Sequence, residues 1–414
     1  MKLIIGKSSE SILKRLANRG ALDLARAEKT AAKIVKDVRK RGDSALLHYS
    51  RKFDGFTGKT VRVNEPEINA AWQQVTPEFR QALETAARNI RRFCEWQRPQ
   101  EWIRDVQPGL KLGQLVRPLD SVGCYVPGGR HPLPSTLLMT VIPAQVAGVP
   151  RIAVVSPRPA PETLAAASLL GVKELYAIGG AQAIAALAYG TRSIPKVNKI
   201  VGPGNAYVTA AKKLVAFDCS IDMLAGPTEV VIVSETGNAG FIAADLVAQA
   251  EHDPDALAIF VTANRKLAAQ MIDETERQSA SNGVARESLK RNGYAIVSES
   301  PDDSMRIANL LAAEHITVPA QKYLAQIESA GSVFVGDYSP QAAGDYASGP
   351  NHVLPTGGSA RFRGGLSVND FVKLITVQEF SALGLGTIAR DITTLARAEG
   401  LLAHAHSIAM RTEA

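Results

Sequence analysis

The chain has 414 residues, a length that predicts two or three structural units. Hydrophobic residues make up 46% and charged residues 21%, which excludes a disordered chain, a collagen-like repeat and a coiled-coil rod. Its 47 basic and 40 acidic residues give a net charge of +7, and the basic residues form no dense cluster interleaved with aromatic ones. The composition therefore indicates a solvated surface of mixed charge and argues against a nucleic-acid partner.

The cysteines and the apolar segments bear on where the protein works. Cys94, Cys124 and Cys219 are scattered and form no CxxC pair, which argues against a disulfide framework and against a thiolate zinc cluster. The N-terminal apolar run is too short for a signal peptide. No segment approaches the roughly 20 apolar residues that cross a bilayer. We therefore expect a cytoplasmic protein without a membrane partner.

The first quarter of the chain reads as mostly helical. Apolar residues recur at helical spacing in Leu22–Arg41 and again in Ala82–Trp96. Between them, Lys59–Ile68 alternates like a short strand followed by a turn. We expect a helical N-terminal region that carries little chemistry.

From about Gly113 onward, short β-branched runs alternate with alanine-rich stretches. The first series of predicted strands is Ser121–Val126, Arg151–Ser156, Glu174–Ile178 and Lys199–Val201, and its helices are Ser135–Ala147, Thr163–Leu170, Gln182–Tyr189 and Ala206–Val215. The second series has strands Glu229–Ser234, Ala258–Thr262, Tyr294–Ser298 and Gly331–Val335, with helices Ala239–Glu251, Arg265–Gln278 and Ser304–Glu314. Repeated strand–helix–strand units form right-handed crossovers and parallel sheets. The predicted fold class is α/β, with two Rossmann-like three-layer modules and helical segments at both ends.

Four glycine-rich turns each follow a predicted strand and precede a predicted helix. They are Tyr125–Arg130, Ile178–Gln182, Val201–Tyr207 and Leu224–Glu229. Glycine there lets backbone N–H groups approach an anion at a helix N-terminus, although a strand-to-helix turn can need glycine for geometry alone. None is a GxGxxG fingerprint or a Walker sequence. Four such turns favour a ligand cleft at the carboxyl ends of the strands.

Three pairs of side chains could bind a metal. Gln249 and His252 lie one helical turn apart near a helix end, Asp345 and His352 share a glycine- and proline-rich loop, and Glu399 and His404 lie on a predicted C-terminal helix. Zinc accepts such nitrogen and oxygen donors and tolerates an open position for substrate. Spacing alone leaves open that these are surface or capping residues.

The adjacent residues Glu314 and His315 are candidates for acid–base chemistry. They are predicted to end a helix before the strand-like sequence ITVP. An acid and an imidazole in a cleft could divide proton transfers between them. Alternatively, the histidine is favoured at a helix C-terminus by the helix dipole.

Eight motifs, read in order, resemble the histidinol dehydrogenase family. They are GCYVPGGRHPLPSTLLMTVIPAQVAGV, IGGAQAIAALAYGT, KIVGPGNAYVTAAKKLV, IDMLAGPTEVVIV, AEHDPDA, AEHITV, GDYASGPNHVLPTGGSARFRGGLSV and EGLLAHAHSIAMR. The resemblance implies oxidation of L-histidinol to L-histidine through L-histidinaldehyde, with two NAD⁺ and one zinc ion per subunit. This reaction is the last step of histidine biosynthesis.

The resemblance also assigns roles to single residues. The implied zinc ligands are Gln249, His252, Asp345 and His404. His315 would be the general base, and Glu314 would activate the water that hydrates the aldehyde. Thr228 and Glu399 would contact the substrate together with His315 and the zinc ligands, and Tyr125, Gln182 and Asn205 would contact NAD⁺. The C-terminal tail reaches the partner's site in this family, which implies a homodimer with shared active sites.

With this resemblance, we expect four parts along the chain. Residues 1–20 would be an N-terminal helical segment. Residues 21–115 and 231–370 would form one discontinuous α/β module, and 116–230 the NAD-binding module. Residues 371–414 would be a helical tail that contributes to the partner's site.

Some residues depart from the family pattern and leave alternatives open. Thr228 stands where serine is common, and Arg130 and His131 replace smaller or neutral residues. A related zinc and NAD⁺ enzyme for another polar alcohol, such as a sulfonated propanediol, is one alternative. The positive charge of Arg130 favours this sulfonated substrate, whereas the Glu399 carboxylate would repel a sulfonate. A non-catalytic paralogue is a further alternative, although every ligand position retains a suitable residue. His406 could replace His404 as a ligand, but the spacing of His404 from Glu399 favours His404.

Overall fold

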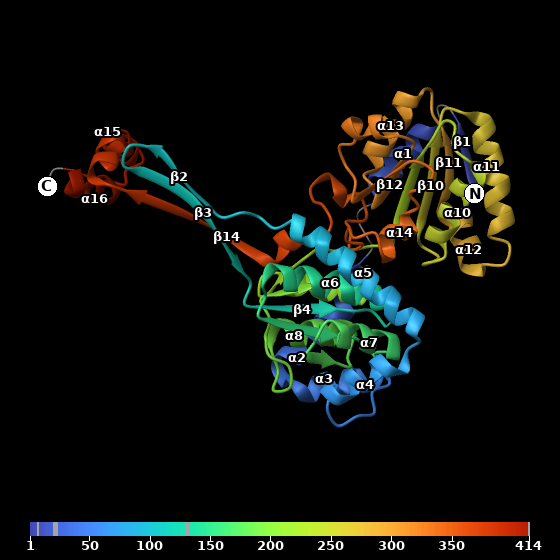
Figure 1. Ribbon diagram of the computed structural model, residues 1–414, viewed down its shortest axis with the longest axis horizontal. Helices are drawn as coiled ribbons and strands as arrows, with labels where there is room; N and C mark the ends of the chain where they lie inside the picture. Colours follow the sequence, from blue (N-terminus) through green and yellow to red (C-terminus); the bar gives the residue numbers. More distant parts are fainter. Residues whose placement is uncertain (6–7, 20–23, 129–131, 413–414) are drawn as a thin grey trace.

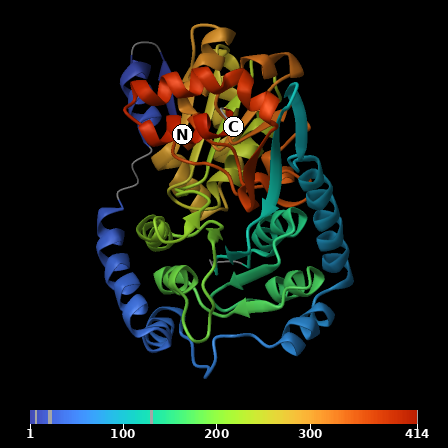
Figure 2. The ribbon, with the colours of Figure 1, turned by 90° about the vertical axis from the view of Figure 1, so that its left-hand side faces the viewer.

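The computed structural model describes residues 1–5, 8–19, 24–128 and 132–412. Two α/β units lie against each other and form the body of the molecule, and a long arm projects from it (Figure 1). Turned by 90°, the body shows a unit built on a five-stranded sheet below a unit built on a six-stranded sheet (Figure 2). The predicted α/β class with two parallel sheets is confirmed.

The six-stranded sheet is parallel throughout, in the order β1-β11-β10-β9-β12-β13. Its strands are β1 (Lys2–Ile5), β9 (Glu229–Val233), β10 (Leu257–Thr262), β11 (Gly293–Val297), β12 (His315–Val318) and β13 (Ser332–Val335). Its helices are α1 (Ser8–Ala17), α10 (Ala239–Ala250), α11 (Arg265–Gln278), α12 (Gly283–Asn292), α13 (Pro301–Leu311) and α14 (Gln341–Tyr346). Along β9, Val231 packs on the face that α1 and α13 cover, and Val230 packs on the face of α10 to α12. Burial on both faces explains the continuous apolar runs of these strands.

The five-stranded sheet is also parallel, in the order β6-β5-β4-β7-β8. Its strands are β4 (Ser121–Tyr125), β5 (Arg151–Val155), β6 (Glu174–Tyr176), β7 (Lys199–Val201) and β8 (Ser220–Ile221). The helices between them are α6 (Pro134–Ala147), α7 (Pro161–Leu169), α8 (Gly180–Tyr189) and α9 (Ala206–Val215). Nearly every residue of α8 is buried, so this helix needs a cover on its outer side as well.

Helices from the first quarter of the chain provide that cover. They are α2 (Ala25–Arg41), α3 (Asp43–Asp54), α4 (Glu65–Gln74) and α5 (Pro77–Trp96). The apolar stripes of α2 and α3 pack into the core with α8 and α9, and those of α4 and α5 pack with α6 and α7. This packing corrects our assignment of residues 21–115 to the module of residues 231–370. A periodic stripe shows which face of a helix is apolar but not which sheet that face meets.

Both ends of the chain contain strands that we did not expect. Residues 1–20 include β1, which pairs in parallel with β11 at the edge of the six-stranded sheet. The tail 371–414 begins with β14 (Val372–Phe380) before α15 (Ala382–Ala398) and α16 (Leu402–Thr412). β14 pairs along its whole length with β3 (Leu110–Pro118), which forms a hairpin with β2 (Trp102–Gln107). The tail is therefore only partly helical.

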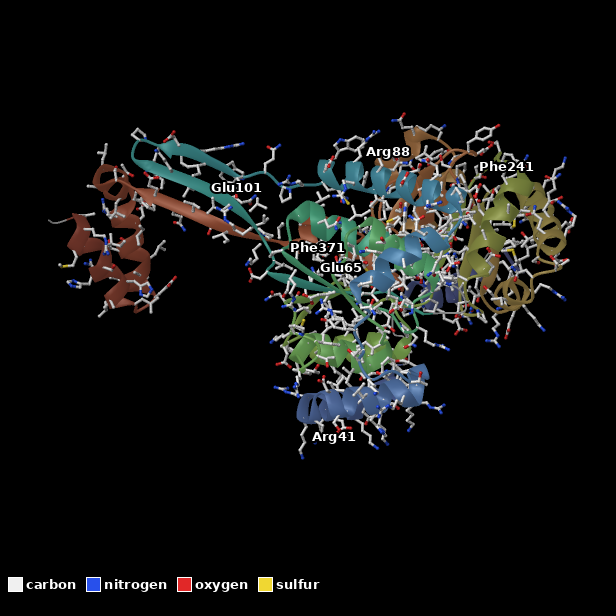
Figure 3. The ribbon with its side chains drawn as sticks, turned by 60° about the horizontal axis from the view of Figure 1, so that its bottom comes forward. Arg41, Glu65, Arg88, Glu101, Phe241 and Phe371 are labelled. Atoms are coloured by element: carbon white, nitrogen blue, oxygen red, sulfur yellow. The ribbon has the colours of Figure 1, made fainter. Side chains whose placement is uncertain are left out.

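The arm consists of this antiparallel three-stranded sheet and the helices α15 and α16 (Figure 3). Phe371, which is fully buried, lies where β14 leaves the body. Large apolar side chains are exposed along the arm, namely Trp102, Ile103, Val106, Leu374, Ile375, Phe380, Leu383, Leu395, Leu401, Leu402 and Met410. This arm therefore presents a large set of exposed apolar side chains on one projecting element. Three short 3-10 segments, Gln321–Gln326, Ser359–Arg361 and Val368–Phe371, complete the described structure. None of the helices in the described ranges has the length and apolarity for a membrane crossing.

A buried ion pair anchors one of the glycine turns in the five-stranded unit. Lys212 of α9 and Asp222 are both shielded from solvent and bonded to each other. Lys212 Nζ also donates to the carbonyl of Gly202 (3.0 Å), and the N–H of Gly202 donates to Asp222 (2.7 Å). The pair therefore holds the turn Val201–Tyr207 through both main-chain groups of Gly202.

We expect Lys212→Met to destabilise the five-stranded unit by about 3–5 kcal/mol, because it leaves the buried Asp222 carboxylate without its positive partner. Lys213→Met is the matched control, since Lys213 pairs with Glu28 at the surface and its loss costs about 1 kcal/mol or less. Denaturant unfolding followed by circular dichroism measures both changes. Equal stability of the two variants would contradict the structural role of the buried pair.

Candidate active site

A cavity of about 470 Å³ lies between the two units, at the edge where β9 and β12 begin. The six-stranded unit contributes Thr228, His252, Glu314, His315, Asp345 and His352 to its lining, and the five-stranded unit contributes Ser135, Thr136, Gly204 and Asn205. The structure thus brings five residues of the predicted site together with Asn205 of the predicted NAD⁺ contacts.

The topology explains why residues far apart in sequence meet at this edge. Parallel strands begin at one edge of a sheet, and the helices between them end there. Thr228 precedes β9, Gln249 and His252 lie at the end of α10, and Asp345 lies at the end of α14. His315 is the first residue of β12 and pairs with Val230 of β9.

This arrangement corrects two expectations. The turn Leu224–Glu229 leads into β9 instead of opening a helix. The pair Glu314 and His315 does not end a helix either, because α13 stops at Leu311 and His315 already belongs to β12. The chemistry of the six-stranded unit therefore lies at the amino edge of its sheet.

Glu314 is buried and its carboxylate is held on one oxygen. Oε2 accepts hydrogen bonds from the hydroxyl of Thr228 (2.5 Å) and from the N–H of Glu229 (2.8 Å). Burial raises the pKa of Glu314 to about 7, against the lowering effects of His315, Thr228 and Glu229 N–H. The carboxyl group can therefore change its protonation state near neutral pH.

His315 lies beside it and is also buried. Its Nδ1 is 3.1 Å from the carbonyl oxygen of Glu229, and its Nε2 is 3.7 Å from Oδ1 of Asp345. A carbonyl only accepts, so Nδ1 carries a proton and the neutral ring has its lone pair on Nε2. Burial alone would lower the pKa of His315, but the Glu314 and Asp345 carboxylates outweigh it and raise the pKa to about 9.

The donor set at the cavity fits a zinc ion. Gln249 is buried, its Nε2 donates to the Thr228 hydroxyl, and its Oε1 has no hydrogen-bond partner. An orphaned buried oxygen calls for a ligand. His252 adds an imidazole and Asp345 a carboxylate from the lining of the cavity, which Gln249 adjoins through Thr228, and zinc accepts this mixture. Within the described ranges, no three His, Cys, Asp or Glu side chains converge as a metal site.

A second cavity, of about 490 Å³, lies at the carboxyl edge of the five-stranded sheet. Tyr125 ends β4, Gln182 lies in the first turn of α8, and Asn205 caps α9 by accepting the N–H groups of Tyr207 and Val208. The three predicted NAD⁺ contacts line this cavity. Asn205 lines the first cavity as well, so the two cavities meet at this residue.

Comparisons with known proteins agree with this geometry. The histidinol dehydrogenase family model matches residues 17–412. The chain belongs to the histidinol dehydrogenase family. A histidinol dehydrogenase of Bacillus thuringiensis subsp. konkukian is 47% identical over 395 residues, which is 93% of this chain and 92% of the relative. One from Methanothermobacter thermautotrophicus is 45% identical over 412 residues and 96% of each chain. The crystal structure of histidinol dehydrogenase from Elizabethkingia anophelis superposes with a TM-score of 0.94 at 38% identity and covers 100% of this chain and 98% of that one.

The predicted histidinol dehydrogenase residues of the tail do not join the site of their own chain. Glu399 follows α15, and His404 and His406 lie on α16, at the end of the arm away from the body (Figure 1). All three are exposed, and the cavity lining includes none of them. Within one subunit, Glu399 and His404 remain apart from Gln249, His252 and Asp345.

Of the three residues that depart from the family pattern, the structure describes only Thr228. The hydroxyl of Thr228 donates to Glu314 and accepts from Gln249, so its proton is used and one lone pair remains. Arg130 and His131 lie outside the described residues. Cys124 is buried in the five-stranded unit, and burial raises the pKa of its thiol to about 12. Packing is therefore its role.

Two residues in these cavities were not in the site that the resemblance implied. His352 lines the first cavity, donates from Nδ1 to the carbonyl of Asp345 (2.7 Å), and faces the Thr136 hydroxyl with Nε2 (3.3 Å). Its place in the loop of Asp345 makes it a candidate metal-binding residue from the sequence alone. Asp54, at the end of α3, lines the second cavity. No sequence signal pointed to it.

Asp54 and Tyr125 also change our view of the turn Ile178–Gln182. Oδ2 of Asp54 accepts the N–H of Gly179 and the amide Nε2 of Gln182, both at 3.1 Å. The Tyr125 hydroxyl accepts the N–H of Gly180 at 3.0 Å. These backbone groups are therefore already paired, and they are not free for an anion as we had expected.

We expect Glu314→Gln to lower the pKa of His315, because the variant removes the negative charge that raises it and leaves the burial that lowers it. The change is read from the pH dependence of the His315 ring signals by NMR in the metal-free chain. Asp253→Asn is the control, since Asp253 lines the same cavity without contacting His315. A pKa of His315 that stays at about 9 in Glu314→Gln would show that Glu314 is not its main partner.

Proposed function

We propose that the chain oxidises L-histidinol to L-histidine through L-histidinaldehyde, with two NAD⁺ and one zinc ion, as the last step of histidine biosynthesis. The observation that carries the proposal is the buried Glu314–His315 pair. It opens into a cavity that also holds the zinc donors His252 and Asp345 and reaches Asn205 of the dinucleotide cavity. The reduced, buried state of all three cysteines supports a cytoplasmic location.

His315 is suited to be the base. Its Nδ1–H is held by the carbonyl of Glu229. Once the ring is neutral, above its pKa of about 9, the lone pair of Nε2 can therefore accept the proton of the substrate alcohol. NAD⁺, when bound, would supply the acceptor for the hydride of the carbon that carries the hydroxyl group, and zinc would supply a positive charge that orients the amino alcohol. Gln249, His252 and Asp345 would hold that zinc, together with His404 from a partner subunit.

Glu314 is suited to the second oxidation. A carboxyl group with a pKa of about 7 can take a proton from water as the aldehyde is hydrated and release it near neutral pH. Thr228 and Glu229 hold one oxygen. No cysteine thiolate is needed, which agrees with the burial of all three thiols.

The arm supports a homodimer with shared sites. It carries exposed apolar side chains along its length and ends in the helix of His404. The body of one chain offers Gln249, His252 and Asp345 as the proposed zinc donors, whereas His404, the proposed fourth donor, and the Glu399 carboxylate lie on the projecting arm. Exchange of arms between two subunits would cover the apolar side chains of each arm and would bring His404 and Glu399 to the cavity of the partner.

We expect two NADH per L-histidinol, no NADH with a sulfonated propanediol, and loss of activity after chelation that zinc restores. Absorbance of NADH with each substrate, before and after chelation, measures this. His315→Asn should keep its zinc and lose about 10²–10⁴-fold in turnover, because it lacks the base. Oxidation of the sulfonated diol in preference to L-histidinol would move the chain to the alternative substrate class.

Subunit mixing tests the shared site. His315→Asn and His404→Ala should each be nearly inactive alone. After mixing, half of the dimers are hybrids with one intact site of two, so about a quarter of wild-type activity should return. Recovery should be absent if each chain builds its own site. His406→Ala is the control for the ligand choice: zinc content should fall in His404→Ala and stay normal in His406→Ala.

A further inference from the structure

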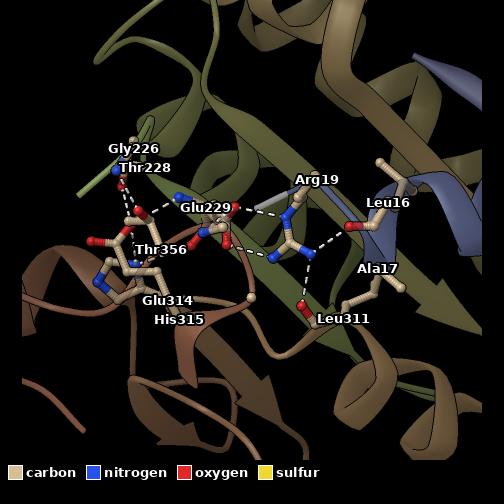
Figure 4. A network of polar contacts seen from close by, with 12 residues as sticks. Leu16, Ala17, Arg19, Gly226, Thr228, Glu229, Leu311, Glu314, His315 and Thr356 are labelled. Carbon is tan, nitrogen blue, oxygen red and sulfur yellow. Dashed lines mark hydrogen bonds and ion pairs between the residues drawn. The ribbon is translucent and has the colours of Figure 1, made fainter. Parts of the chain in front are cut away.

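We infer that Glu229, clamped by Arg19, is a positioning residue that sets the geometry of the Glu314–His315 pair. The inference rests on the proposed function, in which that pair carries out the proton transfers. Glu229 contacts both members through its main chain: its N–H donates to Glu314 Oε2 (2.8 Å), and its carbonyl accepts from His315 Nδ1 (3.1 Å) (Figure 4). One residue therefore orients the acid and the base together.

The side chain of Glu229 is buried and fixed by a bidentate ion pair. Nε and Nη2 of Arg19 bind its two carboxylate oxygens at 2.7 and 2.6 Å. The N–H of Gly357 donates to Oε1 as well (3.0 Å). Bidentate guanidinium–carboxylate pairs have a defined geometry, so Glu229 has little freedom to shift or rotate.

Arg19 is itself tied to the chain that leads into the acid–base pair. Its Nη1 donates to the carbonyls of Leu16 and Leu311, both at 2.7 Å. Leu311 ends α13, three residues before Glu314. Figure 4 shows the resulting network, in which Arg19 lies on one side of Glu229 and the acid–base pair on the other.

Positioning explains this pair better than stability does. A buried ion pair is often no more stabilising than an apolar pair of similar volume, but it defines where its members lie. The carbonyl of Glu229 keeps the proton of neutral His315 on Nδ1 and the lone pair on Nε2. If that carbonyl moved, the ring could carry its proton on Nε2, and that tautomer cannot accept the proton of the substrate.

The chain offers a matched control for a purely structural role. Arg361 Nη2 donates to the carbonyls of Ala17 (3.1 Å) and Leu310 (2.5 Å). It thus joins the same two helix ends as Arg19. Among the residues that the structure describes, none of its hydrogen bonds reaches Glu229, Glu314 or His315.

The test compares Arg19→Met with Arg361→Met in the zinc-loaded full-length enzyme. We expect both to lower the melting temperature, and only Arg19→Met to lower kcat, by about 10- to 100-fold, with zinc content and KM for L-histidinol and NAD⁺ near wild type. Arg19→Lys keeps the positive charge but loses the bidentate guanidinium geometry, so its kcat should lie between those of wild type and Arg19→Met. Equal kcat in Arg19→Met and Arg361→Met would overturn the inference.

A spectroscopic readout separates this inference from the proposed function. With ¹⁵N-labelled histidine at alkaline pH, His315 of the wild type and Arg361→Met should show the proton on Nδ1, and Arg19→Met should show a mixture of tautomers. This measurement needs no substrate, so it tests the positioning role of Glu229 and Arg19 even if L-histidinol is not oxidised. If Arg19→Met does not fold, the same measurement on Arg19→Lys decides. An unchanged tautomer in the variant examined would contradict the inference.

Discussion

The register between the parallel strands β9 and β12 is the constraint on which the site depends. Because His315 pairs with Val230, the residue before Val230 meets the side chains of both Glu314 and His315. Its amide and carbonyl point to the acid and to the base. A slip of one residue would turn these side chains to the opposite face of the sheet and disperse the pair.

The two units use opposite edges of their sheets. The second cavity, where we propose that NAD⁺ binds, lies at the carboxyl edge of the five-stranded sheet, as is usual for ligands of open α/β sheets, whereas the Glu314–His315 pair lies at the amino edge of the six-stranded sheet. Asn205 lines both cavities. Because these two edges meet, the proposed site of the hydride acceptor adjoins the proposed proton acceptor. Neither unit alone would hold the complete chemistry.

Sequence reasoning predicted what depends on local pattern. Short β-branched runs located most strands of the two sheets within one or two residues, although β1 and β8 were missed, and the motifs located Thr228, Glu314 and His315 in one cavity. It could not predict which sheet the helices of residues 25–96 cover, or that β14 pairs with β3, because these contacts join distant segments with no local signal. Asp54 was missed for the same reason. Its carboxylate meets the turn of Gly179 only after the chain has folded.

The central claim is that donors from two subunits converge on one zinc ion beside the Glu314–His315 pair. Anomalous diffraction at the zinc absorption edge, from crystals of the zinc-loaded protein, tests it most directly. One peak per subunit should lie about 2.0–2.2 Å from donor atoms of Gln249, His252 and Asp345 and from the partner's His404. A peak bound by one chain alone, or located away from the cavity of Glu314 and His315, would contradict the account.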